Sequence, residues 1–225
     1  MIGVTVCVNY GHLLKRTLPV WIVGLEQCVI VTDHNDAEVD ELRTDNVRLY
    51  RTDAFYRGAV FNKGGALSAA FDHLGLRDAN DWLCLFDADI MPPKRWHQGL
   101  GDLKPGNLYS APRWQADAMS DIDRPDLERI AEGPDGLCGY FLLFHATDAH
   151  LPQPPEPVFT GWQHAGNYDT VFTLRWPTRC YRMLPLRMIH VGTDRNWWGV
   201  GNAEMMRQMY AERRRRGGYE HEAVQ

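Results

Sequence analysis

The sequence predicts an α/β fold in which helices flank a mostly parallel central sheet, and three observations support this. Short apolar runs rich in β-branched residues recur through the first half of the chain. A segment with helical periodicity lies between two of these runs. Polar residues, among them Asp33, Asp87 and Asp89, follow directly where runs end. Alternating strands and helices are typical of parallel sheets, which bind ligands at the carboxyl ends of their strands.

The first half of the chain is the more regular one. We expect buried strands at residues 4–8, 28–31, 47–50 and 82–86. Residues 62–74 are expected to form a helix, because Leu67, Phe71 and Leu74 fall on one face. A shorter helix is expected at residues 13–21, interrupted at Pro19.

The second half carries weaker signals. Strands are expected at residues 108–111, 137–144 and 187–191, helices at 168–176 and 203–216, and a loop or short helix at 115–136. Four prolines at residues 151–158 predict an extended linker.

Composition bounds the class of protein. The 225 residues suffice for one α/β domain with a full core. A net charge of −5 disfavours a uniformly basic nucleic-acid binder, although a local basic patch stays open. The five cysteines form no CxxC pair, which favours buried thiols in a reducing compartment. The N-terminus resembles a strand rather than a signal peptide and no apolar run is long enough to span a bilayer, so we expect a cytoplasmic protein without membrane insertion.

The strongest local motif is Phe86-Asp87-Ala88-Asp89, directly after the apolar run WLCLF. Two carboxylates in this spacing at a strand end can bind one divalent cation, which offsets their mutual repulsion. Such a cation can bridge the phosphates of a nucleotide diphosphate and stabilise a leaving group. A solvated turn is the alternative interpretation. The position directly after a buried strand favours metal binding over a solvated turn.

His190 ends another apolar run and is followed by Gly192, Thr193 and Asp194. Most histidines in apolar strands are core residues, and that interpretation stays open here. An imidazole ligand suits manganese better than magnesium. With the two aspartates present, we treat His190 as a candidate metal ligand.

Two further candidates lie at expected helix starts. Asn62 and Lys63 open the 62–74 helix, where a lysine and main-chain amides favour anionic phosphates. Asp169 opens the 168–176 helix and can serve as a general base. A solvated lysine and an ordinary capping aspartate are the alternatives.

The order of these motifs resembles that of the glycosyltransferases of GT-A fold, a Rossmann-like fold. The similarity is greatest to the inverting family-2-like enzymes and the β-1,4-galactosyltransferase group. It is carried by FNKGGALSAAF, WLCLFDADIMP, GNYDTVFTLRW and IHVGTDRNWWG, and spans roughly residues 2–200. The resemblance implies a single domain over residues 1–202, with a nucleotide-binding half at 1–93 and an acceptor half at 94–202. A C-terminal helix and charged tail would follow at 203–225.

The resemblance also implies roles for individual residues. Those on the donor side are Tyr10, Asp33, Asn62, Lys63 and Asp87, with Asp33 at the base or ribose. The metal ligands are Asp87, Asp89 and His190, and the catalytic base is Asp169. The sugar and acceptor pocket is lined by Gly139, Tyr140, Trp162 and Tyr168. Tyr168 stands where the family has a glutamate and Ser68 where it has an asparagine, which leaves the donor sugar open.

Together these features predict a metal-dependent, inverting glycosyltransferase that uses a nucleotide-sugar, best a UDP-sugar, with Mn²⁺ or Mg²⁺. A nucleotidyltransferase is the alternative enzyme, but VCVNYGHLLKR lacks the glycine-rich basic loop that such enzymes carry. A non-catalytic nucleotide-sugar binding module is the other alternative.

The acceptor stays open among a glycan, a protein side chain, a small molecule and a modified DNA base. A hydroxymethylated pyrimidine in phage-type DNA, in a bacterial or phage-infected cell, is one specific hypothesis. It rests on Arg207 and the run Arg213, Arg214, Arg215 and Arg216, with Trp162, Trp197 and Trp198 available for stacking. A solvated tail is the alternative interpretation of the arginines.

Overall fold

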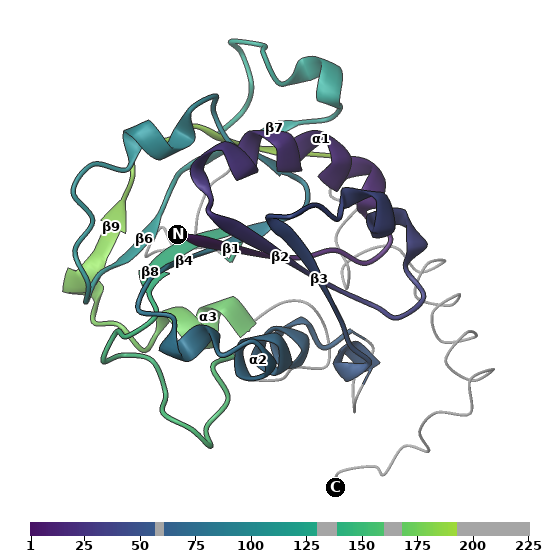
Figure 1. The fold of residues 1–225 in the computed structure, drawn as a ribbon. Helices are drawn as coiled ribbons and strands as arrows, with labels where there is room; N and C mark the ends of the chain where they lie inside the picture. The colour runs from purple at the N-terminus through teal and green to yellow at the C-terminus, as the bar shows by residue number, and fades with distance from the viewer. Residues whose placement is uncertain (57–60, 130–138, 160–167, 193–225) are drawn as a thin grey trace, which may run out of the picture.

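The computed structural model describes residues 1–56, 61–129, 139–159 and 168–192. Its centre is a seven-stranded sheet in the order β3-β2-β1-β4-β8-β6-β9, and a three-stranded sheet in the order β5-β10-β7 lies beside it (Figure 1). The predicted α/β class, with a mostly parallel sheet flanked by helices, is confirmed.

One side of the large sheet is entirely parallel. Its strands are β1 (Ile2–Val6), β2 (Gln27–Thr32), β3 (Val47–Arg51) and β4 (Trp82–Asp87). Each of the four predicted strands of the first half is therefore present, to within two residues at either end. β1 lies between β2 and β4, with Val6 opposite both Val31 and Asp87. The chain runs outward from β1 to β3 and then crosses back to β4, which places a topological switch point at the carboxyl ends of β1 and β4.

The other side of the sheet is mixed. β8 (Phe141–His145) pairs antiparallel with β4 and with β6 (Leu108–Ser110), and β6 pairs parallel with β9 (Tyr181–Met183). The small sheet consists of β5 (Ile90–Met91), β7 (Arg113–Ala116) and β10 (Met188–Val191). The predicted loop at 115–136 thus begins within a strand. β7 was missed because its partner β10 lies about 75 residues further along the chain.

Helices cover both faces of the large sheet (Figure 1). α1 (Gly11–Trp21) lies on one face, and α2 (Lys63–His73) and α3 (Tyr168–Thr173) lie on the other. Seven short 3₁₀ helices are described in the connections: η1 (Ile22–Gly24), η2 (Ala37–Leu42), η3 (Ala54–Tyr56), η4 (Leu76–Asp78), η5 (Trp96–Gly99), η6 (Met119–Asp121) and η7 (Thr178–Cys180).

Proline effects differ from the prediction in two places. Pro19 lies inside α1 without interrupting it, because Leu14, Leu18 and Trp21 bury one face of the helix and outweigh the lost hydrogen bond. The proline-rich segment at 151–158 contains a turn at residues 154–155 and is therefore not extended throughout. Its ends are buried, and Arg77 Nη1 donates to the carbonyls of Pro152 and Glu156, at 2.9 and 2.8 Å.

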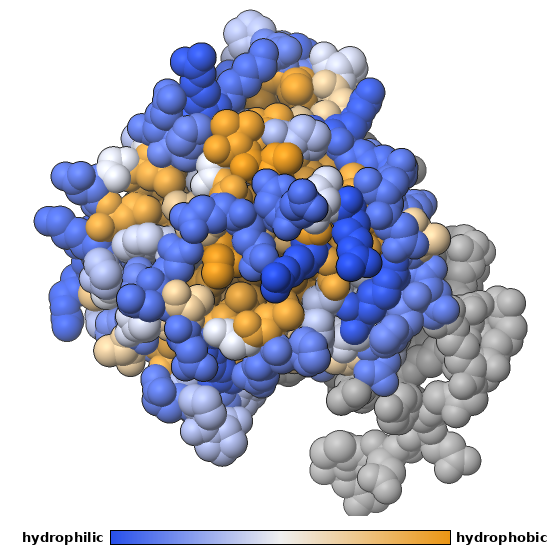
Figure 2. Space-filling view, viewed as in Figure 1, coloured by the Kyte–Doolittle hydropathy of each residue, from blue (hydrophilic) through white to orange (hydrophobic). Residues whose placement is uncertain are grey.

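Two large hydrophobic clusters fill the space between sheet and helices. The cluster under α2 and α3 includes the predicted face of α2, Leu67 and Phe71, with Leu74 packed against it. The cluster under α1 is centred on Trp21, whose ring lies 4.3 Å from that of Phe86 and 5.0 Å from that of Trp96. Figure 2 shows hydrophilic residues around most of the outline, with apolar residues toward the middle, over the sheet. No described helix is long and apolar enough to cross a membrane.

Candidate functional site

The motif Asp87-Ala88-Asp89 lies at the carboxyl end of β4, beside the switch point. Its main chain is held from three directions. The N–H of Asp87 donates to the carbonyl of Tyr140 at 3.0 Å, and the carbonyl of Asp89 accepts from the N–H of Val191 at 2.9 Å. Thr17 Oγ1, from α1, donates to the carbonyl of Ala88 at 2.8 Å. The two carboxylates therefore project from a fixed turn between the two sheets.

Asp87 forms an ion pair with Lys63, the first residue of α2. The Lys63 ammonium also lies 5.0 Å from the centre of the Tyr168 ring. Burial is the largest single influence on the pKa of Lys63 and lowers it, but the contacts with Asp87 and Tyr168 together outweigh burial, so the pKa is raised above its ordinary range. Lys63 is thus a half-buried positive charge at the strand end that carries the aspartates.

Asp89 faces His190 of β10. Nε2 of His190 lies 3.3 Å from Oδ2 of Asp89, and both residues are buried. Oδ1 of Asp89 is also buried, and it has no hydrogen-bond partner among the described residues. A buried carboxylate oxygen without a donor, next to an imidazole, fits a divalent cation, because the cation would supply the missing positive charge.

Asp87, the remaining predicted ligand, pairs with Lys63 rather than with these two residues. Within the described part of the chain, no group of three or more His, Cys, Asp or Glu side chains is gathered closely enough to hold a metal ion. Asp89 and His190 face each other, while Asp87 is turned to Lys63. The metal-binding role of these residues stays a prediction, with Asp89 and His190 as its best-supported part.

Asp169, the candidate base, lies at the start of α3. Its Oδ2 accepts the N–H of Gly139 at 2.9 Å, and its Oδ1 accepts the N–H of Thr170 at 2.9 Å. A Cβ atom on Gly139 would lie 2.4 Å from the Cβ of Asp169, so this contact requires glycine. The Asp169 charge is one of the influences that raise the pKa of Asp87, after burial and the charge of Asp89. Asp169 therefore belongs to the same cluster as Asp87.

The two tyrosines of the predicted sugar pocket are both buried. Tyr168 donates from its hydroxyl to the carbonyl of Gly139 at 3.3 Å, and burial raises its pKa. The ring of Tyr140 packs in the core under α1, with the Arg113 guanidinium 4.5 Å from its centre. The main chain of Tyr140, through its carbonyl, reaches Asp87. A contact of either tyrosine with a sugar stays a prediction.

Tyr10 and Asn62 lie at helix starts near this cluster. Burial, followed by the charges of Asp89 and Asp87, raises the pKa of Tyr10, which is half-buried. Asn62 caps α2, and its Oδ1 accepts the N–H of Gly65 at 2.7 Å. The predicted role of Asn62 in donor binding is not apparent in this capping contact and stays a prediction.

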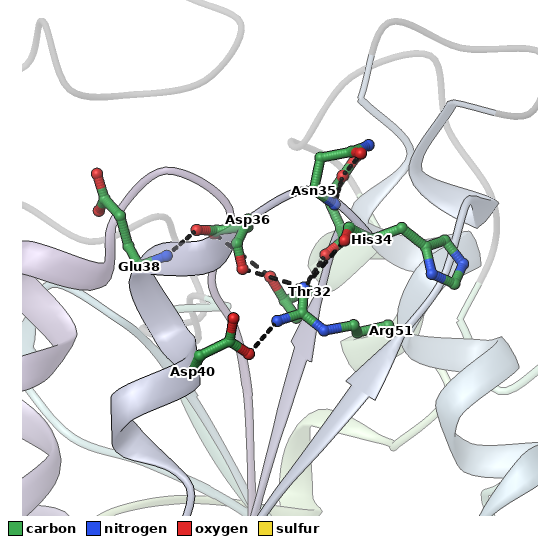
Figure 3. A network of polar contacts seen from close by, with 8 residues as sticks. Thr32, His34, Asn35, Asp36, Glu38, Asp40 and Arg51 are labelled. Carbon is green, nitrogen blue, oxygen red and sulfur yellow. Dashed lines mark hydrogen bonds and ion pairs between the residues drawn. The ribbon is translucent and has the colours of Figure 1, made fainter.

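Asp33 directly follows β2. Arg51 donates to main-chain carbonyls of the loop that begins there (Figure 3). Asp33 Oδ1 accepts from the N–H and the side-chain amide of Asn35, at 2.6 and 3.1 Å. Arg51 Nη1 donates to the carbonyls of Asp33 and Asp36, at 2.7 and 3.0 Å, and Nη2 pairs with Asp40 at 2.5 Å (Figure 3). The buried Asp33 is thus held firmly at the carboxyl end of β2.

Sequence reasoning missed two residues that shape the site. Asp36 joins the loops after β1 and β2, because its Oδ2 accepts the N–H of Asn9 at 2.9 Å and its Oδ1 accepts the N–H of Glu38 at 3.1 Å. An aspartate just before a helix is a common capping residue, so the sequence alone could have identified Asp36.

The second residue is Gln115, which contacts His190 across the small sheet, with Oε1 2.8 Å from Nδ1. No local signal could have found that contact.

Several predicted residues lie outside the described part of the chain. They are Trp162, Trp197, Trp198, Arg207, Arg213, Arg214, Arg215 and Arg216.

No protein-family model matches this sequence, and no curated protein matches it by sequence. Solved structures do show similarity. HddC from Yersinia pseudotuberculosis has a TM-score of 0.50 at 8% identity, over 84% of this chain and 92% of its own. A second HddC structure, complexed with GMP-PN, has a TM-score of 0.48 at 12% identity, over the same shares.

The galactosyltransferase LgtC, solved with donor and acceptor sugar analogues, has a TM-score of 0.39 at 15% identity, over 65% of this chain. This chain covers only 58% of the LgtC chain. At such identities the likeness concerns the fold alone, and HddC carries that argument. The comparisons therefore support the mixed α/β fold and leave the family of this chain open.

Proposed function

We propose that this chain is a metal-dependent glycosyltransferase that moves a sugar from a nucleotide-sugar to a hydroxyl acceptor. The observation that carries the proposal is the gathering of Lys63, Asp87, Asp89, Asp169 and His190 around the carboxyl end of β4. These residues come from four separate segments, because Asp87 and Asp89 belong to the same strand end. In an open α/β sheet this edge, at the switch point, is where ligands bind.

The donor would lie along the ends of β1, β2 and β4. Asp33 and Tyr10 would contact the nucleoside, which we propose to be uridine, and Lys63 would face the phosphates. A half-buried lysine with a raised pKa stays positively charged at neutral pH, as binding a diphosphate requires. Asp87, its present partner, would then be available to the donor or to the metal.

Asp89 and His190, with Asp87, would hold Mn²⁺ or Mg²⁺. The ion would supply positive charge to the diphosphate leaving group. The main-chain bonds to Val191 and Thr17 would keep the carboxylates in place, so that binding does not reorganise the turn.

Asp169 would act as the general base toward the acceptor hydroxyl. Each of its oxygens accepts one main-chain N–H and retains a lone pair for the hydroxyl proton. Removal of that proton lets the hydroxyl oxygen attack the anomeric carbon as the nucleotide leaves. A single displacement of this kind inverts the anomeric centre.

A nucleotidyltransferase is the second candidate. The likeness to HddC favours keeping it, since one HddC structure holds GMP-PN. The β1–α1 loop of this chain, Cys7 to Tyr10, contains no glycine and no basic residue. Such a loop offers little to a triphosphate, so we rank this candidate below the glycosyltransferase.

Thermal unfolding with a panel of nucleotide diphosphates, triphosphates and nucleotide-sugars, each with and without Mn²⁺, tests the proposal. A ligand at about 100 times its Kd should raise the midpoint by about 5 to 10 °C. We expect such a rise with UDP or a UDP-sugar and Mn²⁺, lost in Asp89→Ala and kept in the control Asp102→Ala, which replaces an exposed aspartate.

The other outcomes separate the alternatives. A rise in the unfolding midpoint only with triphosphates would favour the nucleotidyltransferase. No rise with any nucleotide would contradict the proposed donor site. Binding of a nucleotide-sugar without its hydrolysis, and without transfer of its sugar to any acceptor, would favour the non-catalytic binding module.

Once a donor is identified, transfer to glycans and to duplexes containing hydroxymethylated pyrimidines should be assayed. Activity on DNA should fall steeply with salt if the charged tail contributes.

A further inference from the structure

Three side chains from separate parts of the chain contact one another in succession at the small sheet. They are Asp89, between β4 and β5, His190 in β10 and Gln115 in β7. Asp89 Oδ2 lies 3.3 Å from His190 Nε2, and His190 Nδ1 lies 2.8 Å from Gln115 Oε1. His190 is directly opposite Gln115 in the parallel pairing of β10 with β7. The strand register therefore sets this contact.

The orientation of the Gln115 amide follows from its other end. Its Nε2 donates to the carbonyl of Gly192 and lies 3.4 Å from the carbonyl of Ala116. With the amide reversed, Oε1 would face these two carbonyls, and none of the three oxygens carries a hydrogen. Oε1 is thus the atom that faces His190, and because Oε1 can only accept, Nδ1 must carry the hydrogen.

This assignment determines what His190 presents to Asp89 when the imidazole is neutral. A neutral imidazole with its hydrogen on Nδ1 has a lone pair on Nε2. That lone pair points toward a carboxylate oxygen in a site where His190 is only 3% exposed. The second oxygen of Asp89 is buried and has no hydrogen-bond partner among the described residues. Two electron-rich groups held face to face are stable when a positive charge lies between them or beside them.

We propose that Gln115 is a positioning residue that sets the tautomer of His190, so that Nε2 is presented together with Asp89 to the divalent cation. The proposal rests on the proposed function, which places the cation there. Gln115 touches neither the substrate nor the cation, and it acts through His190. Partners of this kind orient histidine ligands, and their loss typically weakens metal binding by about 10- to 100-fold.

The tautomer can be measured without any metal. ¹⁵N NMR of histidine-labelled, metal-free protein at about pH 9, where an ordinary histidine is neutral, reports which ring nitrogen carries the hydrogen. His190 is assigned by its loss in His190→Asn. We expect the hydrogen on Nδ1 in the wild type. Gln115→Met, which keeps the length but has no strong acceptor, should move hydrogen to Nε2.

A hydrogen on Nε2 in the wild type overturns the proposal, whether or not Nδ1 carries one as well. An unchanged tautomer in Gln115→Met overturns it too. The wild-type measurement needs no variant, so it decides the matter even where Gln115→Met does not fold.

Manganese binding is the second readout, measured by the electron paramagnetic resonance of free Mn²⁺ without nucleotide. We expect binding about 10- to 100-fold weaker in Gln115→Met and no binding in Asp89→Ala. Gln98→Leu, at an exposed glutamine in η5, is the matched control and should bind as the wild type does.

The two proposals fail in different ways. If the wild type binds no Mn²⁺ with or without nucleotides, the metal site of the proposed function is wrong and the role of Gln115 falls with it. If the wild type binds and Gln115→Met binds equally tightly, the role of Gln115 alone is wrong.

Discussion

At the scale of single residues, the candidate site is a set of buried and half-buried charges. Lys63 and Asp87 neutralise each other, whereas Asp89 has a carboxylate oxygen with no hydrogen-bond donor among the described residues. A buried polar atom left without a partner costs about 1–3 kcal/mol, more when charged. Such a cost at a strand end is typical of a site that a ligand completes.

Replacement of Asp89 by asparagine tests this directly. We expect Asp89→Asn to unfold, in metal-free buffer, at a temperature equal to or above that of the wild type, because the buried negative charge is gone. The stabilisation by Mn²⁺ and a nucleotide should be lost at the same time. Calorimetry with and without ligands measures both. A clearly less stable metal-free variant would mean that Asp89 is a structural residue instead.

Gly139 offers a second test at this scale. In Gly139→Ala the new methyl group would lie 2.4 Å from the Cβ of Asp169, so Asp169 must move. A displacement of about 1 Å at a reacting group costs roughly 100-fold in rate. We expect kcat to fall by about that factor, with the nucleotide-dependent thermal shift preserved because donor binding does not involve Asp169. Loss of both together would instead indicate general misfolding.

At the scale of elements, the site depends on how α2 and the segment before α3 are joined. Ser68, inside α2, donates to the carbonyl of Phe159 and accepts its N–H, both at 2.8 Å. Phe159 also packs on Phe71 and Phe172, with ring centres 5.2 and 4.6 Å apart. One small hydroxyl therefore satisfies both main-chain groups of a buried residue, which explains how serine serves at this position.

We expect Ser68→Ala to destabilise the fold, because it leaves the buried N–H and carbonyl of Phe159 without their partner. The free energy of unfolding should fall by about 1–3 kcal/mol, which denaturant titration measures. Ser120→Ala, at an exposed serine of η6, is the control and should change stability by less than about 0.5 kcal/mol. An equal effect in both variants would contradict the role of Ser68.

At the scale of the whole molecule, the large sheet and its helices bury three cysteines in the described residues. Cys7, Cys28 and Cys84 are 0% exposed, while Cys180 is half-buried. Burial raises the pKa of Cys28 to about 12 and raises those of Cys7 and Cys84 as well. Because the thiolate is the reactive form, folding should suppress their reactivity.

Alkylation at about pH 8, near the ordinary thiol pKa, should therefore modify Cys180 in the native protein and leave Cys7, Cys28 and Cys84 unmodified until denaturant is added. Peptide mass spectrometry reads each position separately. Rapid native alkylation of Cys28, at the centre of the sheet, would show that the fold opens far more readily than its packing implies.

The first half of the fold could be predicted from the sequence because its determinants are local. Apolar strands of five or six residues and the apolar face of α2 are visible in short windows, and polar residues after strands mark the edge where ligands bind. For the same reason Asp33, Lys63, Asp87 and Asp89 could be chosen as candidates before their positions were known.

The sequence by itself thus determined the α/β class, the four parallel strands and the residue types of the candidate site. Only the tertiary structure decided which of these residues meet: Asp87 with Lys63, Asp89 with His190, Asp169 with Gly139, and Gln115 behind His190. The antiparallel β8 and the small sheet were decided there as well. The physical reason is that these contacts join segments 24 to about 100 residues apart, where pairing depends on sheet register and packing rather than on local periodicity.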